Sequence, residues 1–120
     1  MKVAVSASGN DLASRVDPRF GRAKYFLIVD AESYAVETVD NAQNLNAAQG
    51  AGIQAAETVS RYGAQAVLTG HCGPKAFRAL SAAGIKVYTG LEGTVKEALD
   101  RFKAGELKEA SKADVTGHWW

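Results

Sequence analysis

The residues with the clearest chemical potential lie in the stretch 67–78, where an apolar run ends in two glycines that flank a histidine and a cysteine. His71 and Cys72 stand between Gly70 and Gly73, and the proline that follows suits the first position of a helix. A helix N-terminus offers unpaired N–H groups and a partial positive charge, which favour an anion or a thiolate. This spacing predicts a site for a negatively charged group at a strand-to-helix junction.

His71 and Cys72 are the candidate metal ligands of this stretch. A cysteine beside a helix N-terminus is a better ligand or nucleophile than a buried thiol, and the neighbouring imidazole adds a second donor. An inert cysteine in the core is the alternative interpretation. A closed structural zinc site normally needs four Cys or His ligands, whereas the chain offers only these two residues and His118. Zinc fingers are therefore excluded.

The same residues resemble one enzyme signature. Cys72 is followed after five residues by Arg78, as in cysteine-dependent phosphatases, where the thiolate attacks a phosphate held by loop amides and the arginine. Pro74 removes one of those amides, and no nearby Asp clearly supplies the general acid. A phosphatase that uses Cys72 and Arg78 is the alternative function.

A second group of charged residues lies in the long loop at 8–21, which is rich in Gly, Asn, Asp and Ser. Long ordered loops in compact domains commonly carry function. Arg15, Arg19 and Arg22 lie in or next to this loop and are candidate anion ligands, with a solvated surface as the alternative for each single charge. If the strands before the two candidate loops are neighbours, the arginines face His71 and Cys72 at one edge of the sheet.

Residue patterns predict an α/β fold with a mixed sheet. We expect strands at 2–6, 25–29, 34–39, 66–69 and 85–88, and helices at 49–62, 75–83 and 95–103. The second and third strands are separated by four turn residues and should pair antiparallel. The later alternation of strands and helices predicts parallel pairing.

Local signals set the ends of these helices. Gly63 and Gly84 stand where a left-handed residue ends a helix, and Thr94 with Glu97 forms a capping-box pattern. The first helix has apolar residues at helical spacing. We expect its buried face to contain Ile53, Ala56, Val59 and Tyr62.

Length and composition indicate a single domain at residues 1–110 and a C-terminal tail at 111–120. The 120 residues include 14 basic and 13 acidic side chains, without the basic block that contacts nucleic acid. We expect no membrane span and no signal peptide, because no apolar run is long enough. A single cysteine excludes an internal disulfide, so the cytoplasm is the expected location. Trp119 and Trp120 leave a third class open, an adaptor that holds a partner protein.

Two further enzyme classes are disfavoured. The strand at 2–6 contains no Asp or Glu, so a nuclease built on carboxylate-bound metals lacks its central ligand. The Gly-Ala-Gly sequence at 50–52 lacks the remaining positions of a nucleotide-binding glycine loop. Its glycines are better explained as the start of a helix.

Four segments together resemble the dinitrogenase iron-molybdenum cofactor biosynthesis family. They are Asp-Pro-Arg-Phe-Gly-Arg-Ala-Lys-Tyr-Phe at 17–26, Gln-Gly-Ala-Gly at 49–52, Gly-Pro-Lys-Ala-Phe at 73–77 and Ala-Ala-Gly-Ile-Lys-Val-Tyr at 82–88. The family includes NifX-like and NafY-type carriers, the C-terminal part of NifB-type proteins and small orange proteins. The resemblance implies a ribonuclease-H-like three-layer α/β fold with a mixed five-stranded sheet flanked by helices, without nuclease activity.

The resemblance also implies a non-enzymatic protein that binds, carries or stores an anionic metal-sulfur cluster. The implied cluster contains molybdenum and is of the iron-molybdenum or molybdenum-copper-sulfide type. The implied partner of this monomer is a cluster donor or acceptor protein. Helix N-terminal amides and arginines can hold such an anion without coordinating it, and one labile bond from a soft donor leaves it releasable. Beside the metal ligands His71 and Cys72, the residues expected around the cluster are Arg15, Arg19, Phe20, Gly21, Arg22, Gly70, Gly73 and Lys75.

The chain departs from the family pattern at one point. Family members often carry another pair of residues in place of His71 and Cys72, frequently before Gly-Pro-Asn, whereas Lys75 follows Gly73 and Pro74 here. The additional donors either reflect this protein's particular metal or have no role in binding.

Overall fold

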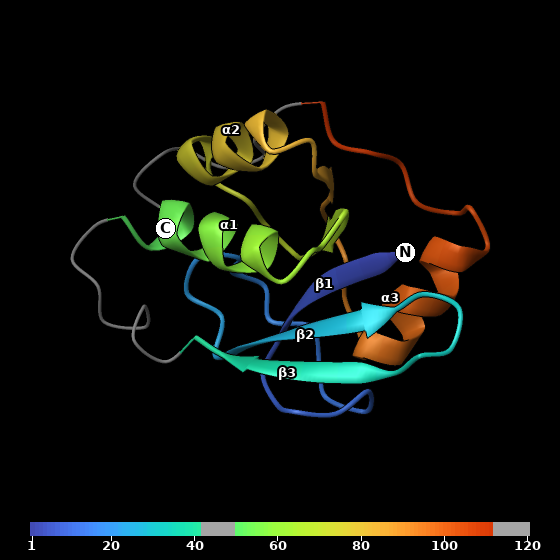
Figure 1. Ribbon diagram of the computed structural model, residues 1–120. Helices are drawn as coiled ribbons and strands as arrows, with labels where there is room; N and C mark the ends of the chain where they lie inside the picture. Colours follow the sequence, from blue (N-terminus) through green and yellow to red (C-terminus); the bar gives the residue numbers. More distant parts are fainter. Residues whose placement is uncertain (42–49, 112–120) are drawn as a thin grey trace.

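The computed structural model describes residues 1–41 and 50–111 and has three layers, with helices on both faces of a mixed five-stranded sheet (Figure 1). The strand order is β3-β2-β1-β4-β5. The strands are β1 (Lys2–Ala7), β2 (Tyr25–Asp30), β3 (Val36–Asp40), β4 (Ala66–Leu68) and β5 (Lys86–Tyr88). The helices are α1 (Ala51–Arg61), α2 (Pro74–Ala82) and α3 (Val95–Lys103). β1 pairs antiparallel with β2 and parallel with β4, so the predicted mixed sheet is confirmed.

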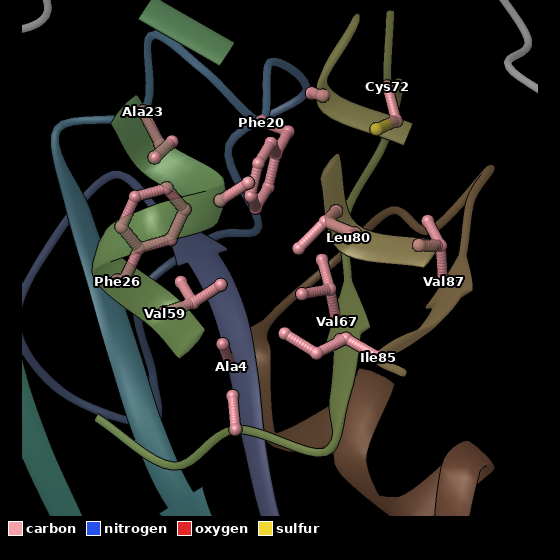
Figure 2. Close-up of a cluster of buried hydrophobic side chains, with 14 of the residues drawn as sticks. Ala4, Phe20, Ala23, Phe26, Val59, Val67, Cys72, Leu80, Ile85 and Val87 are labelled. Carbon is pink, nitrogen blue, oxygen red and sulfur yellow. The ribbon is translucent and has the colours of Figure 1, made fainter. Parts of the chain in front are cut away.

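The central strand β1 is buried from Val3 to Ala7, with apolar side chains at every position but Ser6, because both faces of the sheet are covered. Val3 and Val5 pack on the side of α3, and Ala4 packs on the side of α1 and α2. Figure 1 shows α1 and α2 side by side over one face of the sheet, with α3 on the other. Figure 2 shows the core on the α1 and α2 side, where the rings of Phe20 and Phe26 lie 5.2 Å apart.

The helix ends follow the local sequence signals. Gly63 and Gly84 have positive φ angles of 83° and 76° and directly follow the C-cap residues of α1 and α2, as predicted. The capping box of α3 is confirmed: Thr94 Oγ1 accepts from the Glu97 N–H at 3.1 Å, and Glu97 Oε1 accepts from the Thr94 N–H at 2.8 Å. This second hydrogen bond holds the pKa of the Glu97 carboxyl below its ordinary value of 4.5.

Two details of the predicted elements are wrong. Ile53 is 38% exposed, whereas the buried face of α1 includes the small residues Gly52 and Ala55. Helical spacing alone favours the large apolar residue, but the close approach of another backbone segment favours the small ones. The third strand begins at Val36, two residues later than predicted, because Tyr34 has a left-handed φ of 62° and belongs to the turn.

Tyr34 connects the β2–β3 turn to α3. Its hydroxyl donates to Asp100 Oδ1 at 2.6 Å, and Lys103 Nζ lies 4.9 Å from the centre of its ring. Burial, the hydrogen bond to Asp100 and the negative charge of Asp100 together raise the pKa of Tyr34 to about 12. The contact therefore holds the hairpin against the helix on the α3 side of the sheet.

After α3 the chain returns to the edge of the sheet, where the Ala110 N–H donates to Val87 O at 2.8 Å. Within the ranges described, no helix has the length and apolar character needed to cross a membrane. The predicted tail with His118, Trp119 and Trp120, and most of the loop before α1, lie outside the described residues.

Candidate functional site

The backbone N–H groups at the N-terminus of α3 are hydrogen-bonded within the protein. We divide the loop between β1 and β2 into two arms, and carbonyl oxygens of the first arm, residues 12–16, accept hydrogen bonds from this helix end. Ser14 O accepts from the Val95 N–H at 2.8 Å, and Leu12 O accepts from the Lys96 N–H at 3.0 Å. Together with the capping box, these bonds occupy the amides that an anion would need at the start of α3.

Arg15 belongs to this closed helix end. It forms a bridge with Thr94, and its charge lowers the pKa of Glu97 after the larger effect of the hydrogen bonds from Thr94. The sequence interpretation grouped Arg15 with Arg19 and Arg22 on one side of the sheet edge. The structure places Arg15 on the α3 side.

The second arm of the same loop, residues 17–22, lies between the starts of α1 and α2. On one side the His71 N–H donates to Pro18 O at 2.8 Å. On the other side Gly21 meets α1 so closely that a Cβ at this position would lie 2.9 Å from Gly52 Cα and N. The backbone therefore sets how close this arm lies to both helices.

Gly70 and Gly73 shape the start of α2. A Cβ at Gly70 would lie 2.7 Å from Pro18 Cα and 2.8 Å from Pro18 O, so only glycine permits this approach. Gly73 is the N-cap of α2 and Pro74 its first residue, as predicted. We name the surroundings of the second arm the α1–α2 edge, and define it by Gly50–Gly52, Arg19, Arg22, His71 and Gly73–Lys75.

The two helix starts at the α1–α2 edge differ from that of α3. Within the described residues, neither N-cap, Gly50 or Gly73, makes a side-chain capping hydrogen bond, and neither first turn holds an acidic residue. A helix start without an acidic residue in its first turn favours a nearby anion through its partial positive charge. Lys75 is exposed in the first turn of α2 and adds a formal charge.

Arg19 and His71 are register partners in a short parallel bridge. The Phe20 N–H donates to His71 O at 3.2 Å, next to the bond from His71 to Pro18. Side chains alternate between the two sides of extended backbone, and partners in a bridge share a side. Arg19 and His71 therefore lie on one side, and Phe20 and Cys72 on the other.

Cys72 lies in the core. Its side chain has no exposed surface and packs in the same cluster as Phe20 and Ala76. Figure 2 shows its sulfur among the apolar side chains of that cluster. His71 is half-buried on the opposite side of the backbone. The two expected metal ligands are thus neighbours in the sequence but do not face the same side.

The phosphatase alternative is not supported. A nucleophilic thiolate must meet its substrate, and the thiol of Cys72 is enclosed by apolar side chains. Arg78 is exposed on α2. The described residues therefore do not present a thiolate and a guanidinium to one phosphate.

The loop is anchored at Asp17 by a buried network that sequence reasoning did not find. The Asp17 N–H donates to Ser6 O at 2.8 Å, and Ser6 Oγ donates to Asp17 O at 2.8 Å. Because a hydroxyl has one proton, Thr69 Oγ1 is the donor in its 2.7 Å hydrogen bond with Ser6 Oγ. One sequence signal could have revealed this network: a residue with a hydroxyl group stands at the carboxyl end of two apolar strands, Ser6 in β1 and Thr69 directly after β4.

The remaining predicted residues of the second arm divide by burial. Phe20 and Gly21 are buried and serve packing, whereas Arg22 is half-buried and the Arg19 side chain is 42% exposed. Arg19 is held by Asp17, whose Oδ1 accepts from the Arg19 N–H at 2.9 Å and lies 3.8 Å from Arg19 Nε. Phe20 fixes the arm from the core side and leaves Arg19 at the surface.

The donors at the α1–α2 edge fit an anion better than a bare metal ion. Among residues 1–41 and 50–111, no three His, Cys, Asp or Glu side chains are grouped as a metal site. The edge instead offers helix amides, an imidazole and cationic side chains. Such groups hold a multiply charged anion by hydrogen bonds and charge, without a closed cage of ligands.

Comparison with known proteins gives a consistent result over nearly the whole chain. The family model described as dinitrogenase iron-molybdenum cofactor matches residues 1–105. The apo form of the orange protein from Desulfovibrio gigas is 48% identical, with a TM-score of 0.93 over 95% of this chain and 96% of that one. A Thermotoga protein assigned provisionally as NifB is 42% identical, with a TM-score of 0.78 over 90% and 91% of the two chains. An uncharacterized protein of Methanocaldococcus jannaschii is 29% identical over 111 residues, 91% of each chain.

Proposed function

Because the chain belongs to the dinitrogenase iron-molybdenum cofactor family, we propose that it binds an anionic metal-sulfur cluster and carries or stores it without catalysing a reaction. The observation that supports this proposal is the contrast between the helix starts. The N-terminal N–H groups of α3 are paired with a capping box and loop carbonyls of the same chain. In the described structure, α1 and α2 have no side-chain caps, and the arginine-bearing second arm lies between their N-termini. An anion is the ligand that such an arrangement favours.

The proposed binding groups are the amides at the starts of α1 and α2, together with Arg19, Arg22, His71 and Lys75. His71 is the candidate for one labile bond to a metal of the cluster, because its side chain lies beside Arg19 and away from the core. Hydrogen bonds and charge supply most of the binding in this scheme. A cluster held in this way can be passed on, which a cage of several thiolates would resist.

The proposed cargo contains molybdenum and sulfide. We consider both cluster types that the family resemblance implies, the molybdenum-copper-sulfide type and the iron-molybdenum type. Sulfide-bridged clusters of both types are anionic, so the α1–α2 edge suits either on charge. A donor or acceptor protein would exchange the cluster with this chain, which we expect to be a monomer.

Reconstitution tests the proposal. The purified protein is mixed with tetrathiomolybdate and a copper salt, separated from unbound metal by gel filtration, and examined for a charge-transfer band that elutes with the protein. We expect the band in the wild type and a dissociation constant raised roughly tenfold in Arg19→Ala, which removes one charged contact.

Arg15→Ala is the matched control, because it removes the same charge from the same loop on the α3 side. Its dissociation constant should stay within about twofold of the wild type. The absence of a protein-bound band with tetrathiomolybdate and copper, and with an iron-molybdenum cluster, would contradict the proposed function. Equal effects of both substitutions would contradict the proposed location.

A further inference from the structure

Asp17 places a carboxylate next to a cation that is proposed to hold an anion. The Asp17 side chain is 10% exposed, and its Oδ1 lies 2.9 Å from the Arg19 backbone nitrogen and 3.8 Å from Arg19 Nε. A negative charge at this position opposes the binding of another anion and competes with it for the guanidinium. A protein selected only for tight binding of an anion would not need a charged residue here, because the amide oxygen of Asn can accept the same Arg19 N–H.

The two partners of this contact differ in how firmly they are held. The backbone of Asp17 is fixed on both sides by Ser6, whose carbonyl accepts its N–H and whose hydroxyl donates to its carbonyl. The proline at position 18 further restricts the chain. The Arg19 side chain is 42% exposed and makes a loose ion pair, so it is the partner that can turn toward a ligand.

We propose that Asp17 is a positioning residue that holds the Arg19 guanidinium while no cluster is bound and releases it when the cluster arrives. This inference rests on the function proposed for the α1–α2 edge. When the cluster binds, it replaces the Asp17 carboxylate as the anion that contacts the Arg19 guanidinium. The charge of Asp17 thereby weakens binding and favours release of the cargo.

Asp17→Asn isolates this charge. The amide oxygen of Asn can still accept the Arg19 N–H, so the turn is kept while the competing charge is removed. We expect the dissociation constant for the tetrathiomolybdate-copper product to fall about tenfold, because a nearby unit charge acts on a multiply charged anion. We expect dissociation, followed by chase with an excess of chelator, to slow by a similar factor.

Asp11→Asn is the matched control. Asp11 lies in the same loop, accepts a backbone hydrogen bond from Ala13 at 3.0 Å in a similar turn, and is exposed. The substitution removes the same charge away from Arg19. We expect it to change the dissociation constant by less than about twofold, since solvent screens exposed charges.

A double-substitution cycle separates action through Arg19 from general repulsion. In an Arg19→Ala background, Asp17→Asn should lose most of its effect on the dissociation constant, because the competing contact is already absent. Two results would overturn the proposal while the wild type still binds. Asp17→Asn could leave the dissociation constant unchanged, or it could lower that constant equally in the wild-type and Arg19→Ala backgrounds. A wild type that does not bind would instead overturn the proposed function.

A measurement on the wild-type protein keeps the test valid if Asp17→Asn does not fold. The Nε–H resonance of Arg19, observed by nitrogen-15 NMR, should shift when the protein is loaded with the tetrathiomolybdate-copper product. The corresponding resonance of Arg15 should stay in place. An Arg19 resonance that does not move on loading would contradict the exchange of partners.

Discussion

The side chains of Arg19 and His71 lie on the same side of a short parallel bridge between two loops. The carbonyl of Pro18 accepts from the His71 N–H at 2.8 Å, and the carbonyl of His71 accepts from the Phe20 N–H at 3.2 Å. The same alternation turns Cys72 into the core. This relationship separates the half-buried His71, a proposed binding residue, from Cys72, which is buried in the core.

The first prediction uses the contrast between His71 and Cys72. His71→Ala should raise the dissociation constant for the tetrathiomolybdate-copper product roughly tenfold, because it removes a polar group beside Arg19. Cys72→Ala should leave that constant within about twofold and lower the free energy of unfolding by about 1 kcal/mol through loss of core packing. Titration of the charge-transfer band and urea unfolding measure the two quantities. Loss of the band in Cys72→Ala, with the fold intact, would identify the thiol as a ligand.

The second prediction concerns Gly70. In Gly70→Ala the new methyl group would lie 2.7 Å from Pro18 Cα, so the loop must move. We expect a loss of about 1–3 kcal/mol in the free energy of unfolding and weaker cluster binding. Gly84→Ala is the control, because its φ is 76° and nothing lies within 4 Å of the added carbon. It should cost roughly 1 kcal/mol through backbone strain with unchanged binding, and equal binding in both variants would contradict the prediction.

The third prediction concerns Tyr34 and alkaline pH. Its pKa is raised from 10.0 to about 12 in the folded protein, so its contribution to stability is complete below pH 10 and is lost as the pH rises toward 12. Tyr34→Phe should cost roughly 0.5 kcal/mol near neutral pH, since the hydrogen bond to Asp100 is exposed. It should also reduce the loss of stability between about pH 10 and about pH 12. Urea unfolding across this range is the measurement, and parallel curves for the two proteins would contradict it.

Local sequence signals were sufficient for most of the fold. Apolar runs, helix-ending glycines and the Thr94–Glu97 pair act over a few residues, and the structure confirms the elements that they indicate. The position of Ile53 was not predictable in this way. Its exposure results from the approach of Gly21 to Gly52, a contact between segments far apart in the chain.

The candidate site was only partly predictable for the same reason. Residue types pointed to Arg15, Arg19, Arg22 and His71, whose role in binding stays a prediction, and the local sequence correctly placed a helix start at Gly73 and Pro74. The side on which Cys72 lies depends on the pairing of two loops, and the separation of Arg15 from Arg19 depends on the anchor at Asp17. Neither relationship has a signature within one stretch of sequence.

At the α1–α2 edge, backbone contacts at glycines set the distances between the loop and the two helices, and the charged side chains do not set them. Backbone atoms of Gly21, Gly52, Gly70 and Pro18 fix the spacing of the parts. The exposed side chains of Arg19 and Lys75 are not needed for that spacing. Under the proposed function, substitution at such surface positions would change the preference for one cluster over another without altering the backbone contacts, which makes this small fold a practical starting point for engineering carriers of different clusters.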